Sequence, residues 1–134
     1  PVLYREAVLP WTQRIVQEIQ SLGVPVIVFS TGTAGFLDLV AETGADVIGV
    51  DWRVELDRAW QLIGERAIQG NLDPAWLLAP RSDLERAVRD VLRQAGGRPG
   101  HIFNLGHGVL PETPPDAVAY LVELVHEWPL VPQD

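Results

Sequence analysis

Residues 24–52, VPVIVFSTGTAGFLDLVAETGADVIGVDW, contain two apolar, β-branched runs on either side of one short helical segment. The runs at 24–30 and 46–52 are typical of strands covered on both faces, and Gly44 suits the end of the helix between them. Because the connections are short, this stretch predicts two parallel strands joined by a right-handed helical crossover.

The same alternation continues along the rest of the chain. The segments RAIQGNL (66–72) and HIFNLG (101–106) predict a third and a fourth strand, and helical patterns fill the intervals between strands. The 134 residues have the length of one globular domain, and no linker divides them. We therefore expect an α/β fold in which four parallel strands alternate with helices.

Local signals predict where helices begin and which faces they bury. Residues 4–22 are expected to form a helix whose apolar face carries Val8, Trp11, Ile15 and Ile19. Asp73 is expected to cap a short helix that follows it. Ser82 and Glu85 have the spacing of a capping box, which predicts the start of the next helix.

Polar residues at the strand ends distinguish an open sheet from a barrel. The glycines of STGTAG (30–35) lack the full G-x-G-x-x-G spacing of a dinucleotide-binding turn. Each predicted strand instead ends in small or polar residues, around Gly32, Asp51, Asn71 and Asn104. This is typical of the active face of a (β/α)₈ barrel, which takes about 250 residues. We therefore expect half of a (β/α)₈ barrel, as a fragment of a full one.

Composition excludes several classes of function. The net charge of −8 and the scattered arginines argue against nucleic-acid binding. No apolar run reaches the ~18 residues of a membrane span and no secretion leader is visible, so we expect a cytoplasmic protein without a membrane partner. The chain has no cysteine, and its three histidines lack ligand spacing, so no metal site is expected.

His107 is the leading candidate for catalysis, because it follows a predicted strand and lies between two glycines. An imidazole titrates near neutral pH and can bind a carboxylate or move a proton, and the glycines allow a tight turn beside a large flat ligand. The alternative is a loop histidine whose ring is satisfied by a neighbouring carbonyl. His101 and His126 are expected to be structural.

Further strand-end residues are candidates for substrate binding, each with a structural alternative. Asp51 faces a pocket or caps the helix that follows, and Asn71 and Asn104 bind substrate or hold a loop. Phe29 and Trp52 are candidate pocket walls.

Three segments carry a family resemblance: GVDW (49–52), QGNLDP (69–74) and NLGHGVLPETPP (104–115). In this order and spacing they resemble the C-terminal half of uroporphyrinogen decarboxylase, and the likeness spans essentially the whole chain. The resemblance implies that residues 1–134 form the C-terminal half of one (β/α)₈ barrel domain. It also implies a homodimeric enzyme without metal or organic cofactor that removes four acetate carboxyl groups from uroporphyrinogen III to give coproporphyrinogen III.

The resemblance assigns a functional position to His107, which matches the histidine of the family's GHG segment. It places the family's pocket aspartate, carboxylate-binding arginines and tyrosine in the N-terminal half, so the chain is expected to require that half and to be inactive alone. Two other functions stay open. A corrinoid or coenzyme M methyltransferase of the same superfamily would use cysteine ligands, which are absent here. A non-catalytic half-barrel scaffold is the third possibility.

Overall fold

Four parallel strands lie side by side in the order in which they occur along the chain, β1-β2-β3-β4. The computed structural model describes residues 1–129. The strands are β1 (Ile27–Phe29), β2 (Val47–Gly49), β3 (Ala67–Leu72) and β4 (His101–Leu105). Their register pairs Ile48 with Ile68, and both side chains are fully buried.

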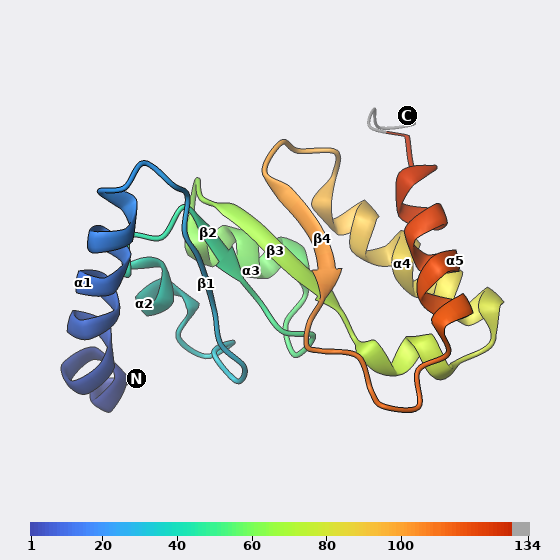
Figure 1. Ribbon diagram of the computed structural model, residues 1–134, viewed down its shortest axis with the longest axis horizontal. Coiled ribbons are helices and arrows are strands. Elements are labelled where there is room, and N and C mark those ends of the chain that lie inside the picture. Colours follow the sequence, from blue (N-terminus) through green and yellow to red (C-terminus); the bar gives the residue numbers. More distant parts are fainter. Residues whose placement is uncertain (130–134) are drawn as a thin grey trace.

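Helices alternate with these strands (Figure 1). They are a π-helical turn η1 (Tyr4–Val8), α1 (Leu9–Gln20), α2 (Leu37–Ala41), α3 (Leu56–Ile63), a 3₁₀-helix η2 (Pro74–Leu78), α4 (Arg81–Ala95) and α5 (Pro115–His126). In the described residues, no helix has the combination of length and apolar character that crossing a bilayer requires.

The core lies between the sheet and the helices on one side of it. Helix α3 buries Leu56, Ala59, Trp60 and Ile63, and this spacing places all four on one helical face. Helix α4 repeats the pattern with Leu84, Val88, Val91 and Ala95, and it ends at Gly96, whose left-handed backbone suits glycine. Both faces pack against the buried isoleucines of the central strands.

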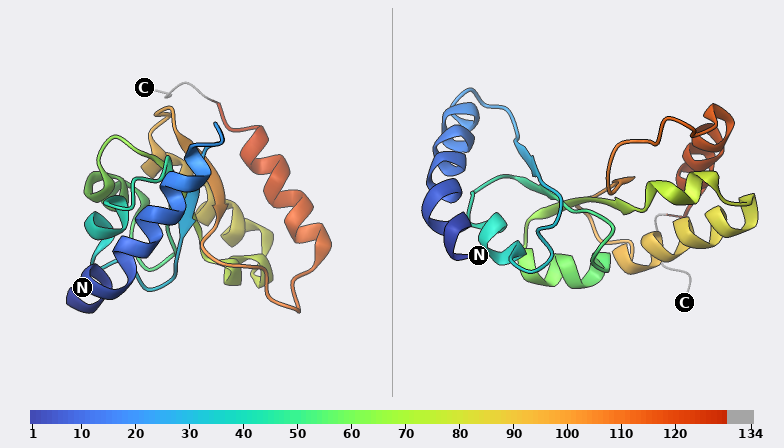
Figure 2. Two further views of the ribbon diagram at one scale, coloured as in Figure 1. Left: turned by 60° about the vertical axis from the view of Figure 1, so that its left-hand side comes forward. Right: turned by 90° about the horizontal axis from the view of Figure 1, so that it is seen from below.

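The helices occupy the convex side of a curved sheet, and α1 and α5 flank its two ends (Figure 2). A doubly wound sheet would reverse its strand order and carry helices on both faces. Sequential parallel strands with helices on one side are instead an arc of a (β/α)₈ barrel. The prediction of half a barrel is therefore confirmed.

Three local predictions were wrong. Strand β1 was expected to be covered on both faces, but Ile27 and Phe29 are exposed because no described helix covers the concave side of the sheet. The apolar face predicted for the first helix is exposed too; α1 buries Leu9 and Val16 instead. The Ser82–Glu85 capping box does not form, because α4 begins at Arg81, with Pro80 as its N-cap residue.

Asp73 does cap η2, as predicted. Its side chain accepts a hydrogen bond from the backbone N–H of Ala75 at 2.9 Å. Trp60 on α3 is buried in the core, whereas Trp11 on α1 is 65% exposed. The apolar periodicity of residues 4–22 therefore located α1, but it did not show which face of that helix packs against the rest of the described chain.

Candidate functional site

The concave side of the sheet presents Phe29 and Asn104, two of the predicted binding residues. Phe29 is 44% exposed and lies across Gly49, whose missing side chain leaves room for its ring. Asn104 is exposed on β4, and its side-chain oxygen accepts a hydrogen bond from the backbone N–H of Leu105. Ile102 is exposed two residues before it, and side chains two residues apart share one face of a strand. Phe29 and Ile102 thus form an exposed apolar surface, and the Asn104 amide lies beside it near the carboxyl end of β4.

Asp51 lies just beyond β2 with only 2% of its surface exposed. Its carboxylate accepts hydrogen bonds from the backbone N–H of Gly32 at 2.7 Å and of Arg53 at 3.0 Å, and from the Arg53 guanidinium at 2.8 Å. Burial on its own would raise the pKa of Asp51, but the hydrogen bonds from Gly32 and Arg53, with the charge of Arg53, lower that pKa. Asp51 does not cap α3, whose first N–H is bound by Gln94.

Asn71 is brought directly against Asp51. Its side-chain nitrogen donates to the backbone oxygens of Asp51 at 3.0 Å and Val54 at 2.6 Å, and the residue is buried. Both amide hydrogens therefore hold the loop after β2. This is the loop-holding alternative foreseen for Asn71, while its contact with a substrate stays a prediction.

His107 is exposed in the loop after β4, beside the same segment. Its ring meets the indole of Trp52 edge to face, with ring centroids 6.2 Å apart. The preceding Gly106 permits this approach, since a Cβ added there would lie 2.5 Å from the backbone nitrogen of Trp52. Gly106 also donates its N–H to the backbone oxygen of Leu72, so the loop is fastened to β3 as well.

The structure thus joins His107, Trp52, Asp51 and Asn71 at the carboxyl ends of the strands. Two participants, Gly32 and Arg53, were not among the binding or catalytic residues predicted from the sequence. Gly32 contributes a backbone N–H, for which the glycine-rich STGTAG turn was the only signal. Arg53 pairs with Asp51 and lies over the Trp52 ring, 4.2 Å from its centroid. An arginine next to a helix start carries no specific sequence signal for such a contact.

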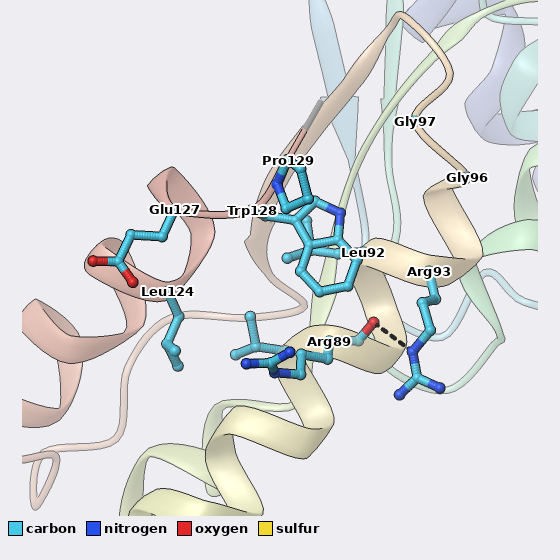
Figure 3. A pocket seen from close by; sticks show the side chains of 10 residues that line it. Arg89, Leu92, Arg93, Gly96, Gly97, Leu124, Glu127, Trp128 and Pro129 are labelled. Atoms are coloured by element: carbon cyan, nitrogen blue, oxygen red, sulfur yellow. Dashed lines mark hydrogen bonds between the residues drawn. The ribbon is translucent and has the colours of Figure 1, made fainter. Parts of the chain in front are cut away.

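Two hollows accompany these strands. One of about 410 Å³ adjoins the site and is lined in part by Trp52, Asn71 and Trp76. The other, of about 450 Å³, lies between α4 and the end of α5 (Figure 3). Arg89 and Arg93 line it, and each is paired with a carboxylate of α4. Because helices and strands run in opposite directions here, this second hollow lies at the end of the sheet away from His107.

His101 lies inside the fold rather than at the site. Its Nε2 donates to the backbone oxygen of Gly70 at 2.8 Å, and its ring packs near Trp60 and Phe103. Burial lowers the pKa of His101, and the hydrogen bond to Gly70 opposes the shift only in part. Among residues 1–129, no group of three His, Cys, Asp or Glu residues is placed to hold a metal ion.

The sequence profile described as "Uroporphyrinogen decarboxylase (URO-D)" matches residues 1–128. The chain belongs to the uroporphyrinogen decarboxylase family. A protein named uroporphyrinogen decarboxylase from Sorangium cellulosum is 54% identical over 127 residues, covering 94% of this chain and 36% of the relative. Its counterpart from Chloroflexus aurantiacus is 55% identical, covering 97% and 38%. The chain therefore spans little more than a third of these uroporphyrinogen decarboxylases.

A solved structure supports the fold independently. A methyltransferase from Methanosarcina mazei superposes with a TM-score of 0.78 at 19% sequence identity. The match covers 92% of this chain and 36% of the methyltransferase, as expected for a fragment of a larger fold. At this level of identity the likeness concerns the fold of this chain and not its chemistry.

Proposed function

We propose that this chain supplies one part of a uroporphyrinogen decarboxylase barrel, which removes the four acetate carboxyl groups of uroporphyrinogen III to give coproporphyrinogen III. The observation that carries the proposal is the placement of His107 at the carboxyl ends of the strands, where barrels of this class have their active sites. Identity above 50% to proteins of that name supports the reaction class.

The reaction needs an electron sink. Protonation of the pyrrole α-carbon next to the carbon that bears the acetate makes a cationic iminium, and cleavage of the bond to CO₂ delivers its electron pair to this cation, which leaves an exocyclic methylene. A second proton converts the resulting methylene into a methyl group as the first is released, so each acetate takes up one proton and loses CO₂. The substrate thereby acts as its own cofactor, and the protein must position the macrocycle and manage protons.

His107 suits this task through its position and chemistry. Its exposed imidazole can donate a hydrogen bond to a substrate carboxylate or pass a proton to it. The ring rests edge to face against the indole of Trp52, and a ring held against such a surface has fewer orientations than a free one. Fixed donors stabilise charge better than mobile ones, because they need not reorganise during the reaction.

The concave side of the sheet provides a surface for the macrocycle itself. Phe29 and Ile102 offer apolar contact to flat pyrrole rings, and the Asn104 amide can bind a side-chain carboxylate. The substrate carries eight carboxylates, whereas this chain has a net charge of −8. The attracting positive charges must therefore come chiefly from the N-terminal half of the barrel. Homodimer formation and a cytoplasmic location are part of the same proposal.

A chimera tests this function. Residues 1–128 replace the aligned segment of the Sorangium cellulosum relative, and the purified chimera receives uroporphyrinogen III under anaerobic conditions. We expect coproporphyrinogen III, separated by chromatography after oxidation, and none from the 134-residue chain alone. A chimera that folds like the parent relative but leaves the substrate intact would refute the proposal.

A further inference from the structure

The carboxylate of Asp51 connects two strand-end loops from a buried position. It binds the N–H of Gly32 in the loop after β1, and both the backbone and the guanidinium of Arg53 in the loop after β2. With 2% of its surface exposed, Asp51 has little surface left to offer a substrate. Within residues 1–129, the groups that donate to its carboxylate are two backbone N–H groups and the Arg53 guanidinium, so its hydrogen-bonding capacity is directed inward.

The backbone at Asp51 extends the connection to the other two strands. Its oxygen accepts a hydrogen bond from Asn71 at the end of β3. Gly106, just after β4, packs so closely on this backbone that an added Cβ would lie 3.0 Å from the Asp51 carbonyl carbon. One residue therefore contacts the loops after β1, β2 and β4 and the last part of β3.

The link from Asp51 to His107 runs through Trp52. Arg53, held by Asp51, lies over the indole at 4.2 Å from its centroid, and His107 contacts the same indole edge to face. Moving Arg53 or the loop after β2 would therefore change the surface against which the imidazole rests.

We propose that Asp51 is a positioning residue: through Arg53 and Trp52 it sets the orientation of the His107 imidazole, and it makes no contact with substrate. A carboxylate is suited to this place because it only accepts hydrogen bonds and faces three donors. An asparagine of the same size would turn an N–H group toward one of those donors, so the loop must move. The catalytic part of this inference rests on the proposed function, whereas the orientation of His107 does not.

The first test measures the orientation of the His107 ring by NMR in the folded chimera. The ring resonances of His107, assigned by their loss in His107→Asn, should carry a ring-current shift from Trp52. Asp51→Asn should move these resonances toward the chemical shifts of a histidine in an unstructured chain. Asp46→Asn is the matched control, because Asp46 also binds a backbone N–H and a side chain, but at the opposite end of β2. It should leave them unmoved.

Unchanged His107 resonances in folded Asp51→Asn would overturn the proposal. If that variant does not fold, Arg53→Gln replaces it, since the Arg53 side chain is half exposed and its loss leaves the core intact. Unchanged resonances in folded Arg53→Gln would overturn the proposal equally. Neither result depends on whether the chimera is active.

The second test is a double-mutant cycle in the chimera. Asp51→Asn should lower kcat by up to about a hundredfold with little change in KM, as small misplacements of a catalytic group do. In a chimera that already carries His107→Asn, adding Asp51→Asn should lower kcat little further, because the imidazole that Asp51 positions is gone. If the kcat losses of the two single variants multiply in the double variant, positioning through His107 is refuted. A rise in KM alone for Asp51→Asn would also refute it, because it would indicate a substrate contact instead.

Discussion

At the scale of single residues, the strand-end polar side chains fall into two groups that the sequence could not separate. His107, Phe29 and Asn104 are exposed, whereas Asp51 and Asn71 are buried and bonded to backbone. A polar residue after a strand indicates the active end of a barrel. Whether its side chain faces outward depends on the path of neighbouring loops, which pattern alone does not specify.

Replacing His107 by asparagine in the chimera should lower kcat while leaving the thermal midpoint near that of the parent. The imidazole is exposed, so its loss costs the fold little. A hydrogen bond to a charged group contributes about 1.5–3 kcal/mol, which corresponds to roughly a ten- to hundredfold loss in rate. Chromatography should reveal partly decarboxylated intermediates. An unfolded variant with full activity per folded molecule would make His107 structural.

His101 should make stability fall as the pH drops. Its pKa is lowered in the folded chain, so the unfolded chain binds the proton more readily below the ordinary value near 6.5. The stability that neutral His101 contributes is fully present above that pH, and it is lost as the pH falls through the lower pKa that His101 has in the folded chain. We expect the urea midpoint to decrease from pH 7.5 to 5.5.

This dependence should weaken in His101→Gln and persist in His126→Gln, which alters an exposed histidine at the end of α5. Equal pH dependence in all three chains would show that His101 is not responsible.

At the scale of elements, the loop after β4 depends on one close approach. A side chain at Gly106 would collide with the backbone of Trp52, whereas one at Gly108 would meet no atom within 4 Å. The sequence indicated that both glycines flank a functional histidine, but only the packing of two loops shows that the first is required for steric reasons.

Gly106→Ala should therefore displace the loop and lower kcat in the chimera, by up to about a hundredfold if His107 shifts by about 1 Å. Gly108→Ala is the matched control on the other side of His107 and should retain activity. Both can be compared by turnover and by the His107 ring resonances. Equal activity in the two variants would show that the close approach is not needed.

At the scale of the whole molecule, the alternation of strands and helices was sufficient to predict half a barrel. The regular rhythm and the short connections allow few other topologies. What the pattern could not show is which apolar faces find partners among residues 1–129. Periodicity identifies an apolar helix face but does not show whether that face is buried. In α1 the apolar face carries Trp11 and Ile15, and both are exposed.

The isolated chain should therefore associate as its concentration rises, because contiguous apolar surface is unfavourable in water. Light scattering should detect this, and a Trp11→Glu, Ile15→Glu double variant should reduce it. Arg14→Gln with Gln17→Glu lowers the net charge by the same two units at exposed positions of α1 and serves as the control. A chain that stays monomeric throughout would contradict this expectation.

Complementation in trans tests most directly whether this chain completes a decarboxylase. The 134-residue chain is mixed in increasing ratio with the part of the Sorangium cellulosum relative that precedes the aligned segment. Coproporphyrinogen III formation is then followed from uroporphyrinogen III. We predict that neither part is active alone and that activity appears on mixing and saturates at equal amounts. A stable one-to-one complex that leaves uroporphyrinogen III unchanged would contradict the account.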